Sequence, residues 1–406
     1  MRQLLVKATV PLVAGALVLA GLSGAAFANA KHAATAKPTF DLAYEGPLSG
    51  GNAQLGLNMA YAVEYAVKQA NSGKSAFGKL PFTLQYVAKD DQGSATKSPT
   101  DAQALVANKS VIAVVGPAFS GATRAAEPIF SANHLATVSP SATLPALAQH
   151  GWKNFFRVVA DDSVQGPADA NYVVNILKDK RLYVVDDASS YGVGLAGAFA
   201  TQAKKDGAKV TTNSFPGTTQ CSDGTGSPTQ YPDDAATVKK AAPQLVFYGG
   251  YYCDLGLLLG ALHSVGFTGK VFSGDGSDSS ALITSTNPRT AANGVYASCG
   301  CAVIGKSAAD KQFAAGFKKV AGFAPAIYSA EAFDAANSII DEMKILASAK
   351  TGTMAITRTA VVAGLHKIKY VGLTKTISFQ PNGNISGNAI YVNRVLQGQL
   401  LQIGLE

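Results

Sequence analysis

Several catalytic and cofactor motifs are missing from this chain of 406 residues. It contains no G-x-S-x-G nucleophile elbow and no H-E-x-x-H zinc motif. The five histidines are scattered, and no two of them stand at the spacing of metal ligands. The sequence therefore offers no support for catalysis, and we expect a protein that is not an enzyme and needs neither a metal nor a cofactor.

The chain also lacks the charge pattern of a nucleic-acid-binding protein. It has 34 Lys and Arg against 26 Asp and Glu, which gives a formal net charge of +8. The basic residues are spread among acidic ones and form no stripes with aromatic residues between them. We expect solvated surface charges and no nucleic-acid partner.

The apolar run at the amino terminus, residues 12–22, is too short to span a bilayer as a mature helix. Arg2 and Lys7 precede this run, and Ala-Asn-Ala at positions 28–30 is a small-x-small cleavage site, so residues 1–30 are predicted to be a secretory signal peptide. No cysteine lies near the cleavage point, where a lipid anchor would be attached. We expect a soluble periplasmic protein, or a secreted or wall-associated one if the cell has no outer membrane.

Four cysteines follow the signal, and in an exported chain disulfides are favoured over a metal site. Three pairings are possible. We favour Cys221 with Cys253, because this bond would tie the segment 217–230, rich in Gly, Ser and Thr, to the body of the protein. Cys299 and Cys301 would then be free, or would form a strained and reducible short loop.

Short strand-like runs alternate with helical ones from residue 39 to about residue 275. Residues 111–115, 182–185 and 245–247 are continuous apolar runs, which are typical of strands buried on both faces of a parallel sheet. Repeated βα units predict doubly wound α/β sheets, with ligands at the carboxyl ends of the strands. Because a single core stops growing near ~250 residues, a chain of this length is expected to form two domains.

The later part of the chain is predicted to be rich in helices. Residues 308–320, 329–347 and 357–368 have helical patterns. Residues 375–380 and 388–396 flank Pro-Asn-Gly-Asn, which is a hairpin signal.

A glycine motif raises the possibility of a dinucleotide. Gly192, Gly194 and Gly197 form a G-x-G-x-x-G that follows a strand and opens a helix. The acidic residue expected about twenty positions later is missing, since residues 210–215 contain no Asp or Glu. A dinucleotide-dependent enzyme stays a remote alternative.

Two turns favour an anion-binding site instead. Residues 116–123 (Gly-Pro-Ala-Phe-Ser-Gly-Ala-Thr) follow a buried strand and precede a helix that Ser120 is expected to cap. Residues 139–143 (Ser-Pro-Ser-Ala-Thr) follow the next strand. Free N–H groups at a helix start, helped by the helix dipole and a hydroxyl, favour a carboxylate.

These two turns, together with residues 162–167, 191–194 and 248–252, resemble the leucine/isoleucine/valine-binding proteins of ABC transporters. The likeness runs from about residue 40 to residue 340 and depends on several motifs in the right order. It implies the type I periplasmic-binding fold, in which two Rossmann-like lobes are joined by three hinge crossings and a ligand is held between them.

The resemblance also implies roles for single residues. Ser120, Ser141 and Thr143, with Ala142 among them, would hold the carboxylate of an amino-acid ligand, and Asp275 would hold its α-ammonium group. The remaining residues expected at the ligand are Tyr251 beside Asp275, Tyr191 and Tyr328 lining the cleft, Ala118 and Phe119 bordering the side-chain pocket, and Leu55.

Two departures from the family pattern stand out. Leu55 takes the place of an aromatic residue near the ligand side chain, so an amide, a urea-like compound or an aromatic acid is an alternative ligand. Gly93 and Phe119 stand where enteric relatives have a first-lobe disulfide.

The expected organisation follows from the same resemblance. A flexible segment at 31–38 precedes one lobe, formed by residues 39–160 and 299–372, and a second lobe formed by residues 161–298 and 373–406. We expect a monomeric clamp that binds an amino acid by closing its hinge and delivers it to a membrane permease of an ABC transporter. The alternative is a sensory binding protein, which would deliver its signal to a receptor and not to a permease.

Overall fold

The computed structural model describes residues 36–221, 226–302, 304–305, 307–387 and 389–405. Residues Lys37–Glu406 form one compact unit that contains two large β-sheets. The predicted signal peptide, and residues 31–35 of the predicted flexible segment, lie outside the described residues. Among the helices that are described, none is long and apolar enough to cross a membrane.

The first sheet has five parallel strands in the order β2-β1-β3-β4-β5. Its strands are β1 (Thr39–Gly46), β2 (Thr83–Asp90), β3 (Val111–Val115), β4 (Ala136–Ser139) and β5 (Phe155–Arg157). Its helices are α1 (Ala53–Asn71), α2 (Ser98–Ala107), α3 (Ser120–Ala132), α9 (Ala308–Ala321), α10 (Ser329–Ala347) and α11 (Arg358–Leu365). We call this sheet with its helices the first lobe.

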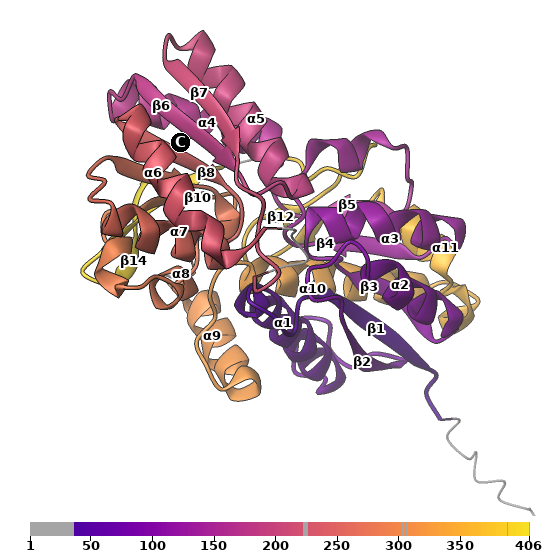
Figure 1. Cartoon of the computed structure of the whole chain (residues 1–406). Coiled ribbons are helices and arrows are strands. Elements are labelled where there is room, and N and C mark those ends of the chain that lie inside the picture. The colour runs from indigo at the N-terminus through magenta and orange to yellow at the C-terminus, as the bar shows by residue number, and fades with distance from the viewer. Residues whose placement is uncertain (1–35, 222–225, 303, 306, 388, 406) are drawn as a thin grey trace, which may run out of the picture. The chain divides into compact units, whose positions relative to one another are not determined.

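Both faces of the first sheet are covered, as predicted for a doubly wound sheet. Leu42 and Tyr44 of β1 pack in the core cluster of α1 and α10, whereas Ala43 between them packs in a separate cluster with α2 and α3. Successive side chains of a strand point to opposite faces, so alternate residues of one apolar run fill both cores. Figure 1 shows the helices on the two sides of this sheet.

The second sheet has seven strands in the order β14-β13-β10-β9-β8-β6-β7. The strands from β6 to β10 run parallel, and β13 and β14 add an antiparallel edge. Its strands are β6 (Arg181–Asp186), β7 (Lys209–Ser214), β8 (Leu245–Gly249), β9 (Lys270–Ser273), β10 (Tyr296–Cys299), β13 (Tyr391–Leu396) and β14 (Gln399–Leu405). Its helices are α4 (Asp162–Asn171), α5 (Ser190–Lys205), α6 (Tyr231–Ala241), α7 (Tyr252–Ser264) and α8 (Ala281–Ser285), and together they form the second lobe.

The chain crosses between the lobes three times. It leaves the first sheet after β5 and enters α4, returns after β10 to α9, which packs on α1, and crosses again between β12 (Thr376–Ile377) and β13. The predicted fold class, two doubly wound lobes with a three-crossing hinge, is confirmed.

The predicted hairpin turn at residues 381–384 is confirmed, because Phe379 and Ile385 form an antiparallel bridge across it, but residues 388–396 are not its second strand. β12 pairs with β11 (Tyr370–Val371), and β13 pairs with β10 and β14. The Pro-Asn-Gly-Asn segment does turn, with the Gly383 N–H donating to the Gln380 carbonyl at 2.9 Å, but it belongs to the third crossing. The β13–β14 hairpin instead turns at Gln397 and Gly398, whose φ angles of 51° and 73° suit a type I′ turn.

All four cysteines are paired in the structure. The predicted bond between Cys221 and Cys253 is confirmed, with a Cα–Cα distance of 5.5 Å. Cys299 and Cys301 form the second disulfide, across only one intervening glycine.

Glu127 on α3 is a buried carboxyl group of the first lobe. Its Oε2 accepts a hydrogen bond from Asn154 Nδ2 at 2.9 Å, and Thr137 donates to its Oε1. Burial raises the pKa of Glu127 to about 7, and these two hydrogen bonds oppose the rise only in part. The native state therefore holds this proton more tightly than the unfolded chain, in which a Glu pKa is about 4.3.

The linkage predicts a loss of stability as the pH rises. The contribution of Glu127 is fully present below about pH 4 and disappears as the pH passes through about 7. We expect Glu127→Gln to lose less melting temperature than the wild type between pH 5 and pH 8, because the variant has no proton to release. Scanning calorimetry at both pH values measures this, and equal losses in the two proteins would contradict it.

Candidate functional site

The predicted site residues lie in loops at the carboxyl ends of both sheets. In the first sheet the loops follow β3 and β4, and in the second they follow β8 and β9. In the first sheet, the chain continues from β1 toward one edge and from β3 toward the other, and the same reversal occurs at β6 and β8 in the second sheet. Such a reversal opens a crevice at the carboxyl ends of the two strands. This topology explains why loops far apart in sequence supply one site.

Asp275 is the charged centre of this region. Tyr191 Oη, from the first turn of α5, donates to Asp275 Oδ1 at 2.8 Å, and the Tyr328 hydroxyl donates to Oδ2. Burial raises the pKa of Asp275, and the two tyrosine hydroxyls lower it in part. Because Tyr328 precedes α10 of the first lobe, the carboxylate of a second-lobe loop is bound from both lobes.

A second carboxyl group, missed by the sequence analysis, lies close to Asp275. Asp162 is fully buried at the start of α4, and neither of its oxygens has a hydrogen-bond partner of good geometry. Burial raises its pKa well above the ordinary value, the charge of Asp275 adds to this, and the Thr143 hydroxyl opposes it. The Thr143 Oγ1 atom is also buried, and its contact with Asp162 does not have the geometry of a good hydrogen bond. The site thus has unused oxygen atoms that suit a ligand with N–H donors.

Asp161 and Asp162 are neighbours at the start of α4, but only one of them caps the helix. Asp161 caps α4 by accepting from the Ser163 N–H at 3.0 Å. Asp162, one position later, is turned into the protein, and only the resemblance over residues 162–167 could have drawn attention to it.

The two turns of the first lobe are bound to each other through their serines. The Ser141 hydroxyl donates to the Ala118 carbonyl at 2.7 Å, and Ser120 Oγ accepts from the Leu144 N–H at 3.2 Å. The expectation that Ser120 caps α3 is therefore wrong, since Phe119 occupies the capping position and Ser120 is the first helical residue. Ala142 between them is fully buried, and its N–H donates to Ser139 Oγ at 3.0 Å.

Arg157, at the end of β5, holds the turn that follows β4. Its fully buried guanidinium donates to the carbonyls of Ala142 and Leu144 at 3.1 and 2.9 Å. It also pairs with Asp161 at 2.9 Å and donates to Asn384 Oδ1 at 2.8 Å. These contacts tie the turn to the first and third crossings. No sequence signal distinguished Arg157 from an ordinary strand residue.

Aromatic rings join the lobes beside Asp275. The Phe119 ring stacks on the Tyr251 ring with 4.1 Å between centroids, and Tyr251 lies 5.1 Å from Tyr191. Ala118 and Leu55 are buried in the same core cluster as these rings.

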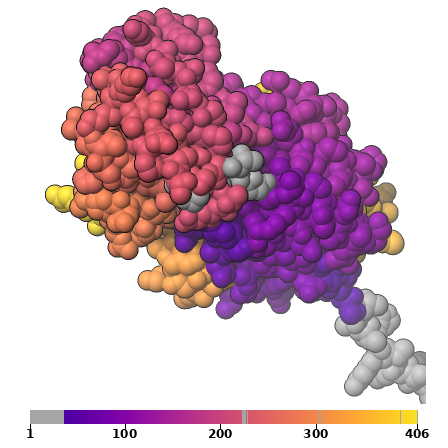
Figure 2. Space-filling model, in the orientation of Figure 1, coloured from indigo at the N-terminus to yellow at the C-terminus, as the bar shows by residue number. Residues whose placement is uncertain are grey.

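Asn52, also missed, makes a polar contact between the lobes. Its Nδ2 donates to the Cys221 carbonyl at 3.0 Å, and its Oδ1 accepts from the Cys253 N–H at 3.3 Å. Gly51 permits the approach, because a Cβ there would lie 2.7 Å from Cys253 Sγ. The Cys221–Cys253 disulfide therefore presents a fixed edge to the first lobe, and Figure 2 shows the indigo surface of that lobe meeting the red surface of the second.

Close packing explains the glycine motif at the start of α5. A Cβ on Gly192 would lie 2.2 Å from Asp187 Oδ1 and 2.4 Å from the Gly249 carbonyl oxygen. Gly197 is exposed, and a Cβ there would meet nothing within 4 Å. Contact between α5 and the end of β8 thus requires the first glycine and not the last.

Comparisons with known proteins identify a matching family and several relatives. The sequence profile of a family described as periplasmic binding protein matches residues 41–399. The chain is similar to the Leu/Ile/Val-binding protein of Escherichia coli, with 30% identity over 63% of this chain and 65% of the relative. It is 29% identical to the leucine-, isoleucine-, valine-, threonine- and alanine-binding protein of Pseudomonas aeruginosa, over 64% of this chain and 65% of the relative.

The fold is also that of solved structures. The substrate-binding protein of a branched-chain amino acid transporter from Streptococcus pneumoniae, solved in complex with isoleucine, has a TM-score of 0.78. The two sequences are 23% identical, and the match covers 91% of this chain and 99% of the other.

Alanine substitutions separate the two glycines. We expect Gly192→Ala to destabilise the protein by ~1–3 kcal/mol through overpacking. Gly197→Ala, on the exposed face of the same helix, should be neutral or stabilising by up to ~1 kcal/mol, because alanine favours the helix. Urea unfolding measures both, and equal effects of the two substitutions would show that the packing argument is mistaken.

Proposed function

This chain belongs to the periplasmic binding protein family, and from that premise we propose that it is the extracytoplasmic solute-binding protein of an ABC transporter. Its ligand is a branched-chain or similar amino acid, bound between a lobe of residues 39–160 and 299–372 and a lobe of residues 161–298 and 373–406. The observation that carries the proposal is the buried Asp275 carboxylate, hydrogen-bonded from both lobes next to the oxygens of Asp162 and Thr143, which have no hydrogen-bond partner of good geometry.

An amino-acid zwitterion suits this set of groups. Its ammonium group loses hydration on entering a closed site, and this is costly unless a fixed opposite charge replaces the water. Asp275 supplies that charge, with Asp162 beside it. The loops after β3 and β4 supply the hydroxyls of Thr143 and Ser120 for the carboxylate. In the structure described here the Ala142 N–H and the Ser141 hydroxyl donate to Ser139 and Ala118, so they would have to exchange these partners for the ligand.

Hinge closing follows because the two lobes bind opposite ends of the ligand. The ligand interacts with both lobes only when they meet, so it shifts the open–closed equilibrium toward the closed form. The contacts of Asn52 with the Cys221–Cys253 edge, and of Phe119 with Tyr251, belong to that form. A membrane permease would recognise the closed protein and receive the amino acid.

Calorimetric titration of the mature protein tests the function. We expect saturable binding of L-leucine, L-isoleucine or L-valine in the micromolar range, about −8 kcal/mol. Leu55, in place of an aromatic residue, motivates including amides, urea and aromatic acids in the panel. Heat with those compounds alone would replace the amino acid with the alternative ligand class, and no heat with any compound would refute a solute-binding role.

The role of Asp275 predicts the effect of removing its charge. We expect Asp275→Asn to weaken amino-acid binding by at least ~2 kcal/mol, because the buried ammonium group loses its partner. Asp233→Asn, an exposed aspartate of the second lobe, serves as the matched control and should bind normally. An unchanged dissociation constant in Asp275→Asn would reject the ammonium role.

Asn52 is predicted to stabilise the closed form without touching the ligand. Asn52→Ala removes two hydrogen bonds between the lobes, so we expect the dissociation constant to rise about five- to thirtyfold, or about 1–2 kcal/mol. The exposed Asn175→Ala is the control. Stopped-flow measurements should place the change in the dissociation rate, since the closed state opens more readily. Identical rates in Asn52→Ala and Asn175→Ala would exclude the contact from closing.

A further inference from the structure

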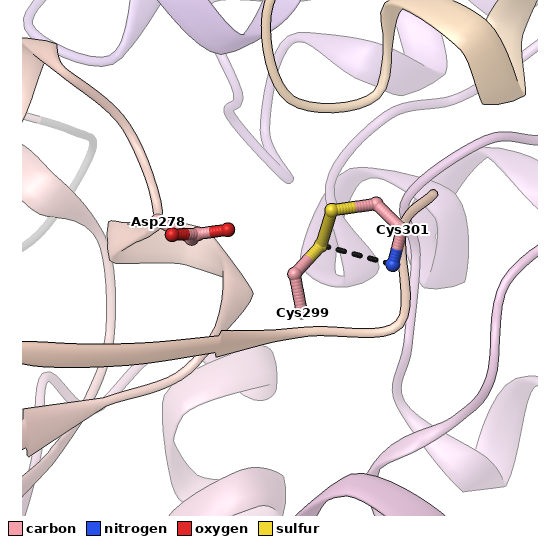
Figure 3. Close-up of side chains that lie close together, drawn as sticks. All are labelled: Asp278, Cys299 and Cys301. Atoms are coloured by element: carbon pink, nitrogen blue, oxygen red, sulfur yellow. Dashed lines mark hydrogen bonds between the residues drawn. A yellow bond between two sulfur atoms is a disulfide. The ribbon is translucent and has the colours of Figure 1, made fainter. Parts of the chain in front are cut away.

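A second cluster of reactive side chains lies apart from the ligand site. The Cys299–Cys301 disulfide and Asp278 bring two Sγ atoms and a carboxylate oxygen within 4.8 Å of one another, and all three residues are buried. Figure 3 shows the Asp278 carboxylate extending toward the two sulfur atoms. Asp278 follows the short helix that begins at Asp275, whereas the cysteines end β10 and begin the second crossing.

Asp278 has bonding capacity that nothing in the described structure uses. Its Oδ2 accepts a hydrogen bond from Asn393 Nδ2 at 2.7 Å. Its Oδ1 is buried without a hydrogen-bond partner, although the residue is only 4% exposed. A buried oxygen without a partner costs free energy, so its retention beside two cysteines points to a ligand.

The cluster can be reached from the surface. A cavity of about 350 Å³ has Gly300, Cys301 and Ala302 in its wall, together with residues 374–376 and residues 386–387 of the third crossing. Gly300 also approaches the first crossing, because a Cβ added to it would lie 3.2 Å from Ala160 Cβ. A small reductant or a metal ion can therefore reach Cys301 where the three crossings meet.

The Cys299–Cys301 bond is the more easily reduced of the two disulfides. A disulfide gains stability from the loop that it closes in the unfolded chain, and this gain grows with loop length. The separations are 2 residues here and 32 for Cys221–Cys253. An external dithiol reduces the bond by two electrons: the S–S bond breaks, each Sγ takes one hydrogen, and the dithiol is oxidised to its own disulfide.

We propose that the reduced cluster binds one soft divalent metal ion, such as Zn²⁺, through Cys299 Sγ, Cys301 Sγ and Asp278 Oδ1. Two thiolates and a carboxylate are accepted zinc ligands, and a water molecule would complete the tetrahedral set. Each thiol releases its proton when the metal binds. The oxidised protein cannot bind the ion in this way, because both sulfur atoms are already used by the disulfide.

Cobalt provides the probe for this site. The mature protein is reduced with dithiothreitol, freed of it by anaerobic gel filtration, assayed for thiols and titrated with Co²⁺. We expect about one Co²⁺ per chain, with thiolate-to-cobalt charge-transfer absorption, and none in the oxidised protein. The absence of that absorption, or a failure to reduce the bond, would overturn the proposal.

Matched variants identify the ligands. The double variant Cys299→Ser/Cys301→Ser keeps the Cys221–Cys253 bond and should lose the charge-transfer band after the same treatment. Asp278→Asn should keep both thiols and bind Co²⁺ at least tenfold more weakly. An undiminished band in the double variant, with a native circular dichroism spectrum, would assign the metal to Cys221 and Cys253 and refute the site. Unchanged affinity in Asp278→Asn would remove the carboxylate ligand and refute the three-ligand proposal.

Discussion

The buried carboxylate of Asp275 is the constraint on which the site depends. It lies on a loop of the second lobe, and the hydroxyls of Tyr191 and Tyr328 donate to its two oxygens from α5 and from the start of α10. A negative charge without water must be surrounded by donors. Two tyrosines donate to it from different lobes, and a cation bound between the lobes would add the opposite charge that hydroxyl groups cannot supply.

The rest of the framework holds the loops around this charge. Doubly wound sheets bring the carboxyl ends of β3, β4, β8 and β9 to the crevices, and buried hydrogen bonds then fix each loop. Arg157 joins the turn after β4 to two crossings, so the geometry of the first-lobe site depends on the hinge. Arg157 therefore contacts both the proposed ligand-binding turn and the hinge.

The hinge itself carries chemical groups as well as backbone. Cys299 and Cys301 lie where the second crossing leaves β10, and Asp278 is three positions beyond Asp275. One short segment of the second lobe thus links the carboxylate of Asp275 to the cysteine cluster. Reduction or metal binding at the crossings would act on the same segment that is proposed to bind the ammonium group.

The sequence by itself determined the α/β class and the two lobes, because apolar periodicity, turn residues and chain length can be read from the sequence. It favoured the Cys221–Cys253 bond among three possible pairings, and the structure decided for it. The resemblance of its motifs to those of leucine/isoleucine/valine-binding proteins also indicated the loops near Asp275. Only the tertiary structure decided that Asp162 faces inward while Asp161 caps α4, that Ser120 binds the neighbouring turn, and that the Pro-Asn-Gly-Asn turn lies in the third crossing. Arg157 and Asn52 act through partners up to 227 and 201 positions away, and such pairings are created by the folded chain alone.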